Sequence, residues 1–148
     1  MTSKSNTILR HILNEIRKSS LSSRSHSKKV ISWIEDHRLR SKAAKALVFI
    51  LPTRGCSWAL SGSGGCSFCG YLYDNPKQTN FDEMIDQFKL HLKEKLTDDQ
   101  ILSVKLFTSG SILDPKEVPE HVLLTLIEQL SLYPHIQEIV LESRPEYV

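Results

Sequence analysis

From residue 46 onward, apolar runs of strand length alternate with amphipathic segments of helical length, and this alternation constrains the fold most. The runs at residues 46–51, 101–107 and 136–142 predict strands. The segments 81–96 and 119–132, with apolar side chains at helical spacing, predict helices. An order of this kind implies a parallel sheet with right-handed crossovers, so we expect an α/β fold. In such sheets the loops after the carboxyl ends of the strands carry the function.

Two further amphipathic segments precede the first strand, and they predict two helices, at residues 7–18 and 28–39. We therefore expect residues 1–44 to form a helical extension and residues 45–148 to form the core domain. Within the core domain, Asn80 is a candidate N-cap for its helix, with Glu83 three residues later as in a capping box.

Positive charge is concentrated in the first part of the chain. Residues 1–46 contain eleven Lys and Arg against three Asp and Glu, whereas the remaining residues contain eight against fourteen. A basic block on an otherwise acidic chain indicates contact with a polyanion, nucleic acid above all. Two alternatives are a solvated N-terminal arm and an organelle transit peptide, since the stretch is also rich in serine.

Three classes of protein do not suit this composition. No apolar run reaches the length of a membrane span, and 40% of the residues are hydrophobic, which does not suit a mainly disordered chain. The three cysteines cannot all pair with one another, and no signal-peptide core stands at the start, so a secreted disulfide scaffold is not expected. These features indicate a reducing compartment, and we expect a cytoplasmic protein.

All three cysteines follow the first core strand in the glycine- and serine-rich loop 53–80, with the spacing C-x9-C-x2-C. Thiolates are soft donors that suit iron–sulfur clusters or zinc. Structural zinc sites have four protein ligands, and the next histidine, His91, lies inside a predicted helix and is expected at the surface. Three thiolates fit a 4Fe-4S cluster with one iron left open, which favours catalysis. A zinc- or iron-binding RNA module without catalysis and three unrelated cysteines remain alternatives.

The cysteine motif, with Phe68 directly before its last cysteine, resembles that of the radical S-adenosylmethionine (SAM) superfamily. The wide spacing is similar to the branch that contains the Elongator catalytic subunit. More narrowly, four segments are similar to the family of archaeosine synthase radical SAM subunits, which are archaeosine biosynthesis lyases. These segments are residues 53–58 (TRGCSW), 65–71 (GCSFCGY), 109–115 (SGSILDP) and 142–146 (ESRPE).

The resemblance implies the N-terminal half of a partial (β/α) barrel, with a 4Fe-4S cluster held by Cys56, Cys66 and Cys69. In this family the open iron binds SAM, and one electron cleaves it to methionine and a 5′-deoxyadenosyl radical that abstracts hydrogen from the substrate. A half barrel also leaves a catalytically incomplete fragment as an alternative.

The resemblance also implies a set of SAM contacts, although it identifies no catalytic residue. Glu142 matches a family acid that holds SAM, and a surface acid is its alternative. Arg144 could clamp a carboxylate or form a salt bridge at the barrel rim. The remaining candidates are two aromatic residues near the adenine, which could instead pack under the loop, and a tripeptide at the position of the family's Gly-Gly-Glu motif, without its acid: Phe68, Tyr71, Ser109, Gly110 and Ser111.

Relatives of this type act on tRNA, where they cleave a lysine adduct on a 7-deazaguanine base together with a lysine-transferring partner subunit. The resemblance therefore implies tRNA, that partner subunit and an electron donor as partners. The candidates for phosphate contacts are basic residues of the N-terminal part: Lys28, Lys29, Arg38, Arg40, Lys42 and Lys45.

Overall fold

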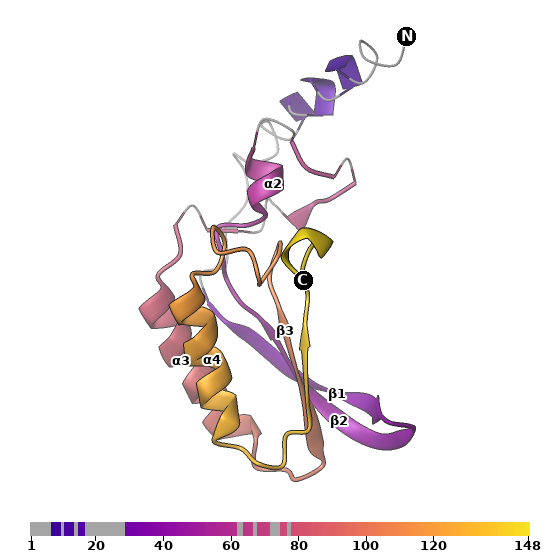
Figure 1. Cartoon of the computed structure of the whole chain (residues 1–148), viewed down its shortest axis with the longest axis vertical. Helices are drawn as coiled ribbons and strands as arrows, with labels where there is room; N and C mark the ends of the chain where they lie inside the picture. Colours follow the sequence, from indigo (N-terminus) through magenta and orange to yellow (C-terminus); the bar gives the residue numbers. More distant parts are fainter. Residues whose placement is uncertain are drawn as a thin grey trace.

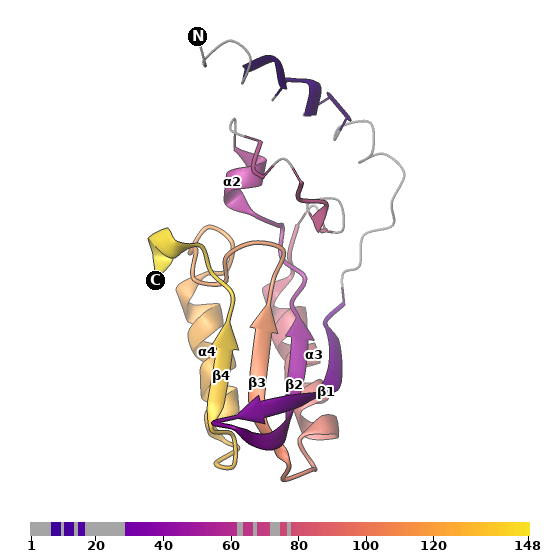
Figure 2. The ribbon, with the colours of Figure 1, turned by 90° about the vertical axis from the view of Figure 1, so that its right-hand side faces the viewer.

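A four-stranded sheet with two helices on one face forms the centre of the molecule (Figures 1 and 2). The computed structural model describes residues 7–9, 11–13, 15–16, 29–61, 64–66, 68–71, 75–76 and 78–148. The strand order is β1-β2-β3-β4; β1 runs antiparallel to β2, and the other neighbours are parallel. The strands are β1 (Ile31–Leu39), β2 (Lys42–Ile50), β3 (Ile101–Phe107) and β4 (Glu138–Leu141), and the two helices are α3 (Phe81–Lys95) and α4 (Glu120–Ser131).

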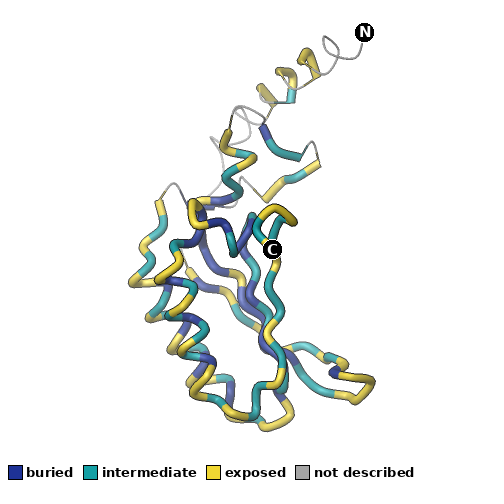
Figure 3. Tube along the Cα trace, in the orientation of Figure 1, coloured by how far each residue is buried: buried dark blue, intermediate teal, exposed yellow. Residues whose placement is uncertain are grey.

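The hydrophobic core lies between the helices and the sheet, where Figure 3 shows the buried residues. In β2 and β3 every second side chain points to the helices, because side chains alternate across a strand. The aromatic rings of Phe49 in β2 and Phe88 in α3 are 4.6 Å apart between centroids. The other main contributors repeat every third or fourth residue along the helices or every second residue along the strands: Leu47, Val104, Leu106, Met84, Leu92, Val122, Leu126 and Leu130.

The elements from residue 42 onward follow the alternation that the sequence predicts. Strand β3 has the predicted bounds, α3 ends one residue earlier, and α4 begins directly after Pro119. The described residues of the segment 7–16 are helical, in agreement with the helix predicted at 7–18. That this sheet begins a (β/α) barrel of the radical SAM type stays a prediction. Among the described residues, no helix combines the length and the apolar character needed to cross a membrane.

The N-cap prediction for α3 is confirmed. The side-chain oxygen of Asn80 accepts a hydrogen bond from the backbone N–H of Glu83 (3.2 Å). The Glu83 carboxylate accepts from Nε2 of Gln87 (3.0 Å), one turn further along the helix. The cap places the start of α3 directly after the cysteine loop.

The helix predicted at residues 28–39 is wrong, since residues 31–39 form β1, which pairs with β2 over nine residue pairs. Ile31, Trp33 and Ile34 are β-branched or aromatic, so they suit a strand at least as well as a helix. The two strands are joined by Arg40 and Ser41, both with positive φ (46° and 69°), as a tight two-residue hairpin turn requires. The turn lacks the usual Asn or Gly, so the sequence carries no recognisable hairpin signal.

Strand β1 also crosses the face of the sheet that the helices leave open (Figure 2). An ion pair between Glu35 and Lys105 of β3 and a hydrogen bond between His37 and Glu138 of β4, both at 2.8 Å, fix it there. Ser103 of β3 donates a hydrogen bond to the same Glu138 oxygen (2.7 Å). The predicted division at residue 44 therefore falls within the sheet, which includes residues from Ile31 onward.

Candidate functional site

The carboxyl ends of β2, β3 and β4 point to the end of the molecule that holds the short helix α2 (Ser57–Leu60) and the 3-10 turn η2 (Pro145–Tyr147) (Figure 2). The loop after each of these strands therefore reaches the same region. One of the three, the loop after β2, contains all the cysteines. This is the edge at which parallel α/β sheets hold their ligands.

A pocket of about 520 Å³ opens among these loops, a size that suits a small-molecule ligand or cofactor. All three cysteines line it. So do six of the seven residues for which the family resemblance implies SAM contact: Phe68, Tyr71, Ser109, Gly110, Glu142 and Arg144. The structure thus brings together residues from loops that are far apart in the sequence.

The three cysteines are partly exposed thiols. Cys66 and Cys69 are in one tight turn, in which the N–H of Cys69 donates to the carbonyl of Cys66 (3.2 Å). Among the described residues, no three His, Cys, Asp or Glu side chains converge as they would around a single metal ion. The thiolates of a 4Fe-4S cluster each bind a different iron, so they need not converge on one point. Three thiols that line one pocket are a donor set that fits such a cluster.

The loops after β2 and β3 touch at Cys56. A Cβ atom on Gly110 would lie 2.7 Å from the Cα of Cys56 and would collide with the Glu117 carboxylate. Only glycine fits such an approach of two backbones. Within the cysteine loop, Gly65 has a φ of +71° and packs equally closely on Ala59.

Ser111 does not line the pocket, so its contact with SAM stays a prediction without support from this geometry. It is fully buried, and its hydroxyl binds the loop after β4. Its hydroxyl lies 2.6 Å from that of Ser143 and accepts from the backbone N–H of Arg144 (3.1 Å). Ser109 lines the pocket, and its hydroxyl donates to the side-chain oxygen of Asn75.

Two buried carboxylates below the pocket, Asp114 and Glu117, were not identified from the sequence. Both lie in the loop after β3 and are almost inaccessible to solvent. Glu117 accepts backbone N–H groups of Ser57 and Ser111, each at 2.7 Å. Asp114 accepts from the hydroxyl of Ser57 and from Nη2 of Arg144 (2.8 Å). A buried acid is expected to be paired in this way.

The bonds of Arg144 match the predicted alternative of a salt bridge rather than a free clamp. Besides Asp114, its guanidinium faces Glu146 (3.4 Å) and lies 5.0 Å from the ring centroid of Tyr147. Burial lowers the pKa of Arg144, but the electrostatic influence of Cys56 and Glu146 outweighs burial, so the pKa lies above its ordinary value. Arg144 is therefore positively charged at neutral pH.

The same contacts determine the charge of Asp114. Burial raises the pKa of this carboxyl, but hydrogen bonds from Ser57 and from the backbone N–H of Lys116 outweigh burial, so the pKa lies below its ordinary value. Asp114 is therefore ionised at neutral pH and can hold Arg144 against the loop.

The rim of the pocket is rich in exposed aromatic surface. Phe68 is 90% exposed and Tyr71 68% exposed, so neither is packing under the loop. Trp58 in α2 is 41% exposed on the same pocket. Glu142 is also exposed at the pocket, directly after β4.

His91 does not line this pocket, and it is half-buried, whereas the sequence predicts a surface position. It lies in α3, where its Nδ1 is 2.8 Å from the hydroxyl of Ser32 in β1. Its ring stacks near Phe49 at 6.4 Å between centroids.

Four of the six basic residues predicted to contact phosphate lie away from the pocket. Arg38, Arg40 and Lys42 surround the β1–β2 turn, which lies at the end of the sheet opposite α2 (Figure 1). Lys45 pairs with Asp98 (3.2 Å). Lys28 lies outside the described residues, and Lys29 precedes β1.

Two other cations do border the cysteine loop. Arg54 and Lys116 are exposed and line a concavity of about 260 Å³ together with Ser57 and Ser61. No carboxylate lines this concavity, and neither cation has an ion-pair partner within the described part of the chain.

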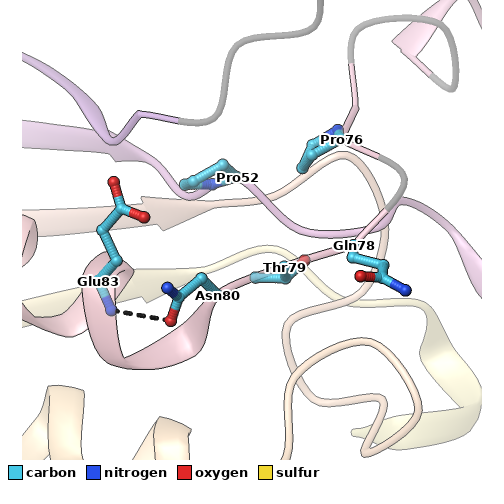
Figure 4. Close-up of a pocket in the computed structure, with 6 residues that line it drawn as sticks. All are labelled: Pro52, Pro76, Gln78, Thr79, Asn80 and Glu83. Atoms are coloured by element: carbon cyan, nitrogen blue, oxygen red, sulfur yellow. Dashed lines mark hydrogen bonds between the residues drawn. The ribbon is translucent and has the colours of Figure 1, made fainter.

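A separate pocket of about 300 Å³ lies at the start of α3, between Pro52 and the residues that precede the helix (Figure 4). Its polar groups include the Asn80 cap, which is already bonded to Glu83. None of the cysteines lines this pocket.

The fold and site together define an α/β protein with a three-cysteine pocket at the carboxyl edge of its sheet. The chain is 30% identical over 118 residues to archaeosine synthase subunit beta of Methanosarcina acetivorans. The aligned region covers 79% of this chain and 33% of that protein. It is 33% identical over 117 residues to archaeosine synthase subunit beta of Thermococcus kodakarensis. Here the aligned region covers 78% of this chain and 36% of that protein.

A third relative, an uncharacterised protein of Methanocaldococcus jannaschii, is 36% identical over 147 residues, or 94% of this chain and 40% of that protein. The chain therefore spans two fifths or less of the length of these curated relatives. No family model matches the chain. No solved structure matches it either.

Proposed function

We propose that this chain forms the cluster- and SAM-binding part of a radical SAM enzyme that modifies tRNA in archaeosine synthesis. One observation carries the proposal: the three cysteines and six residues with an implied role in SAM binding line the same pocket. The similarity to two proteins named archaeosine synthase subunit beta supports the choice of pathway.

The thiolates of Cys56, Cys66 and Cys69 would hold a 4Fe-4S cluster in this pocket, and a cluster so held supplies the electron for reductive cleavage of SAM. The chain's own contribution is to bind and orient. Glu142 is exposed at the pocket and can accept hydrogen bonds from an ammonium group or from ribose hydroxyls. Phe68 and Tyr71 offer aromatic faces on which an adenine can stack.

The nucleic-acid contact is proposed at the cysteine loop. Arg54 and Lys116, at the cysteine loop, have no ion-pair partner among the described residues, whereas the basic β1–β2 turn lies at the opposite end of the sheet. A phosphate seated between the two cations would bring an RNA strand next to the pocket. The name of the relatives, a subunit beta, supports a further subunit as partner, which on the family resemblance transfers lysine.

Anaerobic reconstitution with iron and sulfide tests the proposal. About four irons and four sulfides per chain are expected, with an absorption band typical of iron–sulfur proteins. Under a low-potential reductant, the loaded chain should release 5′-deoxyadenosine from SAM. The Cys69→Ser variant should bind less iron and release no 5′-deoxyadenosine. Gln78→Ala, outside the cysteine pocket, should behave as the parent chain.

Two results would contradict the proposal. One tightly bound zinc per chain with no SAM cleavage would favour a metal-binding RNA module. A full cluster in the Cys69→Ser variant would show that this thiol is not a ligand.

A further inference from the structure

The strongest unassigned feature is the carboxylate of Glu117, which is buried below the pocket with 2% of the residue exposed. One carboxylate oxygen accepts the N–H of Ser57, the residue after Cys56, and the other accepts the N–H of Ser111, the residue after Gly110. Both bonds are 2.7 Å long. A single side chain thus binds the backbones of two separate loops, one oxygen to each.

Both bonds lie at the place where the two loops touch. Gly110 leaves no room for a Cβ between Cys56 and the Glu117 carboxylate. The position of the Cys56 backbone is therefore fixed both by contact with Gly110 and by the hydrogen bond that the N–H of Ser57 donates to Glu117. The packing alone cannot supply this alignment, because van der Waals contact has no direction whereas a hydrogen bond does.

The neighbouring acid extends the same arrangement to the third loop. Asp114 binds the hydroxyl of Ser57 and Nη2 of Arg144, and that nitrogen is also 3.0 Å from the Ser57 hydroxyl. The guanidinium lies 3.9 Å from Glu117. One cation therefore faces two buried carboxylates, and the residue after Cys56 is bonded to both acids.

We propose that Glu117 is a positioning residue that holds Cys56 in register with the loop after β3, with Asp114 and Arg144 as its support. The importance of Cys56 rests on the proposed function, but the positioning itself needs no bound metal. The proposal predicts that loss of the Glu117 contact makes the backbone at Cys56 more mobile and its thiol more reactive, while Cys66 and Cys69 stay unchanged.

The first test measures the alkylation rate of each cysteine in the reduced, metal-free full chain, by peptide mapping after timed exposure to iodoacetamide. In Glu117→Gln one oxygen acceptor becomes an N–H donor that faces a backbone N–H, so one loop must separate. Because hydrogen bonds to charged groups are strong, we expect Cys56 to react about tenfold faster or more. Cys66 and Cys69 serve as internal references, and Glu120→Gln, an exposed acid at the start of α4, is the matched control.

A second pair of variants acts from the other partner and covers the case in which Glu117→Gln does not fold. Ser57→Pro removes the N–H that Glu117 accepts, at the first position of α2, where proline is well tolerated. Cys56 already has extended dihedrals (φ −59°, ψ 120°) that suit a residue before proline. Ser57→Ala removes only the hydroxyl, so it isolates the contribution of the N–H.

We expect faster alkylation of Cys56 in Ser57→Pro and a much smaller change in Ser57→Ala. A mere loss of global stability would accelerate all three cysteines together, and that result overturns the proposal. An unchanged Cys56 rate in both Glu117→Gln and Ser57→Pro also overturns it. Since these rates are measured without iron, a failed reconstitution of the parent chain would count against the proposed function alone.

Discussion

At the scale of single residues, the pocket depends on how closely two backbones approach at Gly110. A methyl group there would meet the Cα of Cys56 and the Glu117 carboxylate, neither of which can move without breaking buried hydrogen bonds. Gly70 lies in the same cysteine loop, yet nothing is within 4 Å of its virtual Cβ. The two glycines therefore make a matched pair.

We expect Gly110→Ala to lower the free energy of unfolding by about 1–3 kcal/mol, the usual effect of overpacking. Gly70→Ala should change it by less than about 0.5 kcal/mol, as exposed substitutions generally do. Urea unfolding followed by circular dichroism measures both. Equal effects of the two substitutions would contradict the close approach of the loops.

Arg54 and Lys116 carry a second prediction at this scale. If each contacts an RNA phosphate, Arg54→Ala and Lys116→Ala should each weaken binding of tRNA uniformly across sequences. Each should also reduce the steepness of log K against log salt by about one. Lys89→Ala, an exposed lysine of α3, is the control. Filter binding over a series of salt concentrations measures the slope, and unchanged slopes would remove these cations from the interface.

The sequence predicts the cysteines of the site well and its buried acids poorly. The C-x9-C-x2-C spacing identifies Cys56, Cys66 and Cys69 because their chemistry is local in the sequence. Asp114 and Glu117 stand in a turn-rich loop, where acidic residues are usually exposed. Their partners, Ser57 and Arg144, are distant in the chain, so only the folded structure shows that these acids are buried and paired.

At the scale of secondary-structure elements, the predicted helices and strands after residue 42 agree with the structure because each has a clear period. Strand β1 was missed because its apolar residues do not decide between a helix and a strand, and because Arg40 and Ser41 form a tight turn without the usual turn residues. Its partner, the first half of β2, is rich in Ala and Lys, which are weak strand formers. Tertiary pairing determines this hairpin.

The ends of β1 and β4 are linked through Glu138, and this link should depend on pH. Hydrogen bonds from Ser103 and His37 lower the pKa of Glu138 below its ordinary value of 4.5. A depressed pKa stabilises the folded state above the unfolded value, and this stabilisation is lost as the pH falls through the folded pKa. The free energy of unfolding should therefore decrease as the pH drops below 4.5.

Glu138→Gln should make that decrease shallower, because the carboxyl that gains the proton is gone. Urea unfolding at a series of pH values tests this, with the exposed Glu94→Gln as control. Identical pH profiles for the parent chain and Glu138→Gln would exclude the link as a source of the dependence.

At the scale of the whole molecule, binding of a cluster should stabilise the chain. A group that binds only the folded state raises the free energy of unfolding, and the three cysteines come together only when the loop is folded. We expect the reconstituted chain to melt at a higher temperature than the metal-free chain. The difference should vanish when a chelator strips the iron and should be absent in Cys66→Ser.

Calorimetry under anaerobic conditions measures both transitions. A chain whose melting temperature is the same with and without bound iron would show that the metal is not held by the folded loop. At this scale the sequence predicts the parallel α/β arrangement and the edge that carries the site, whereas the antiparallel β1 and its path across the open face follow from contacts that no local pattern encodes.

The pocket separates two kinds of side chain by depth. The carboxylates that join the loops, Asp114 and Glu117, are buried and do not line it, whereas the aromatic groups Phe68 and Tyr71 stand exposed on its rim. Substitutions on the rim would thus change which molecules bind, while the buried hydrogen bonds between the loops keep their geometry. A designer who wished to redirect this pocket to another ligand would vary the aromatic pair first and leave Asp114, Glu117 and Arg144 unchanged.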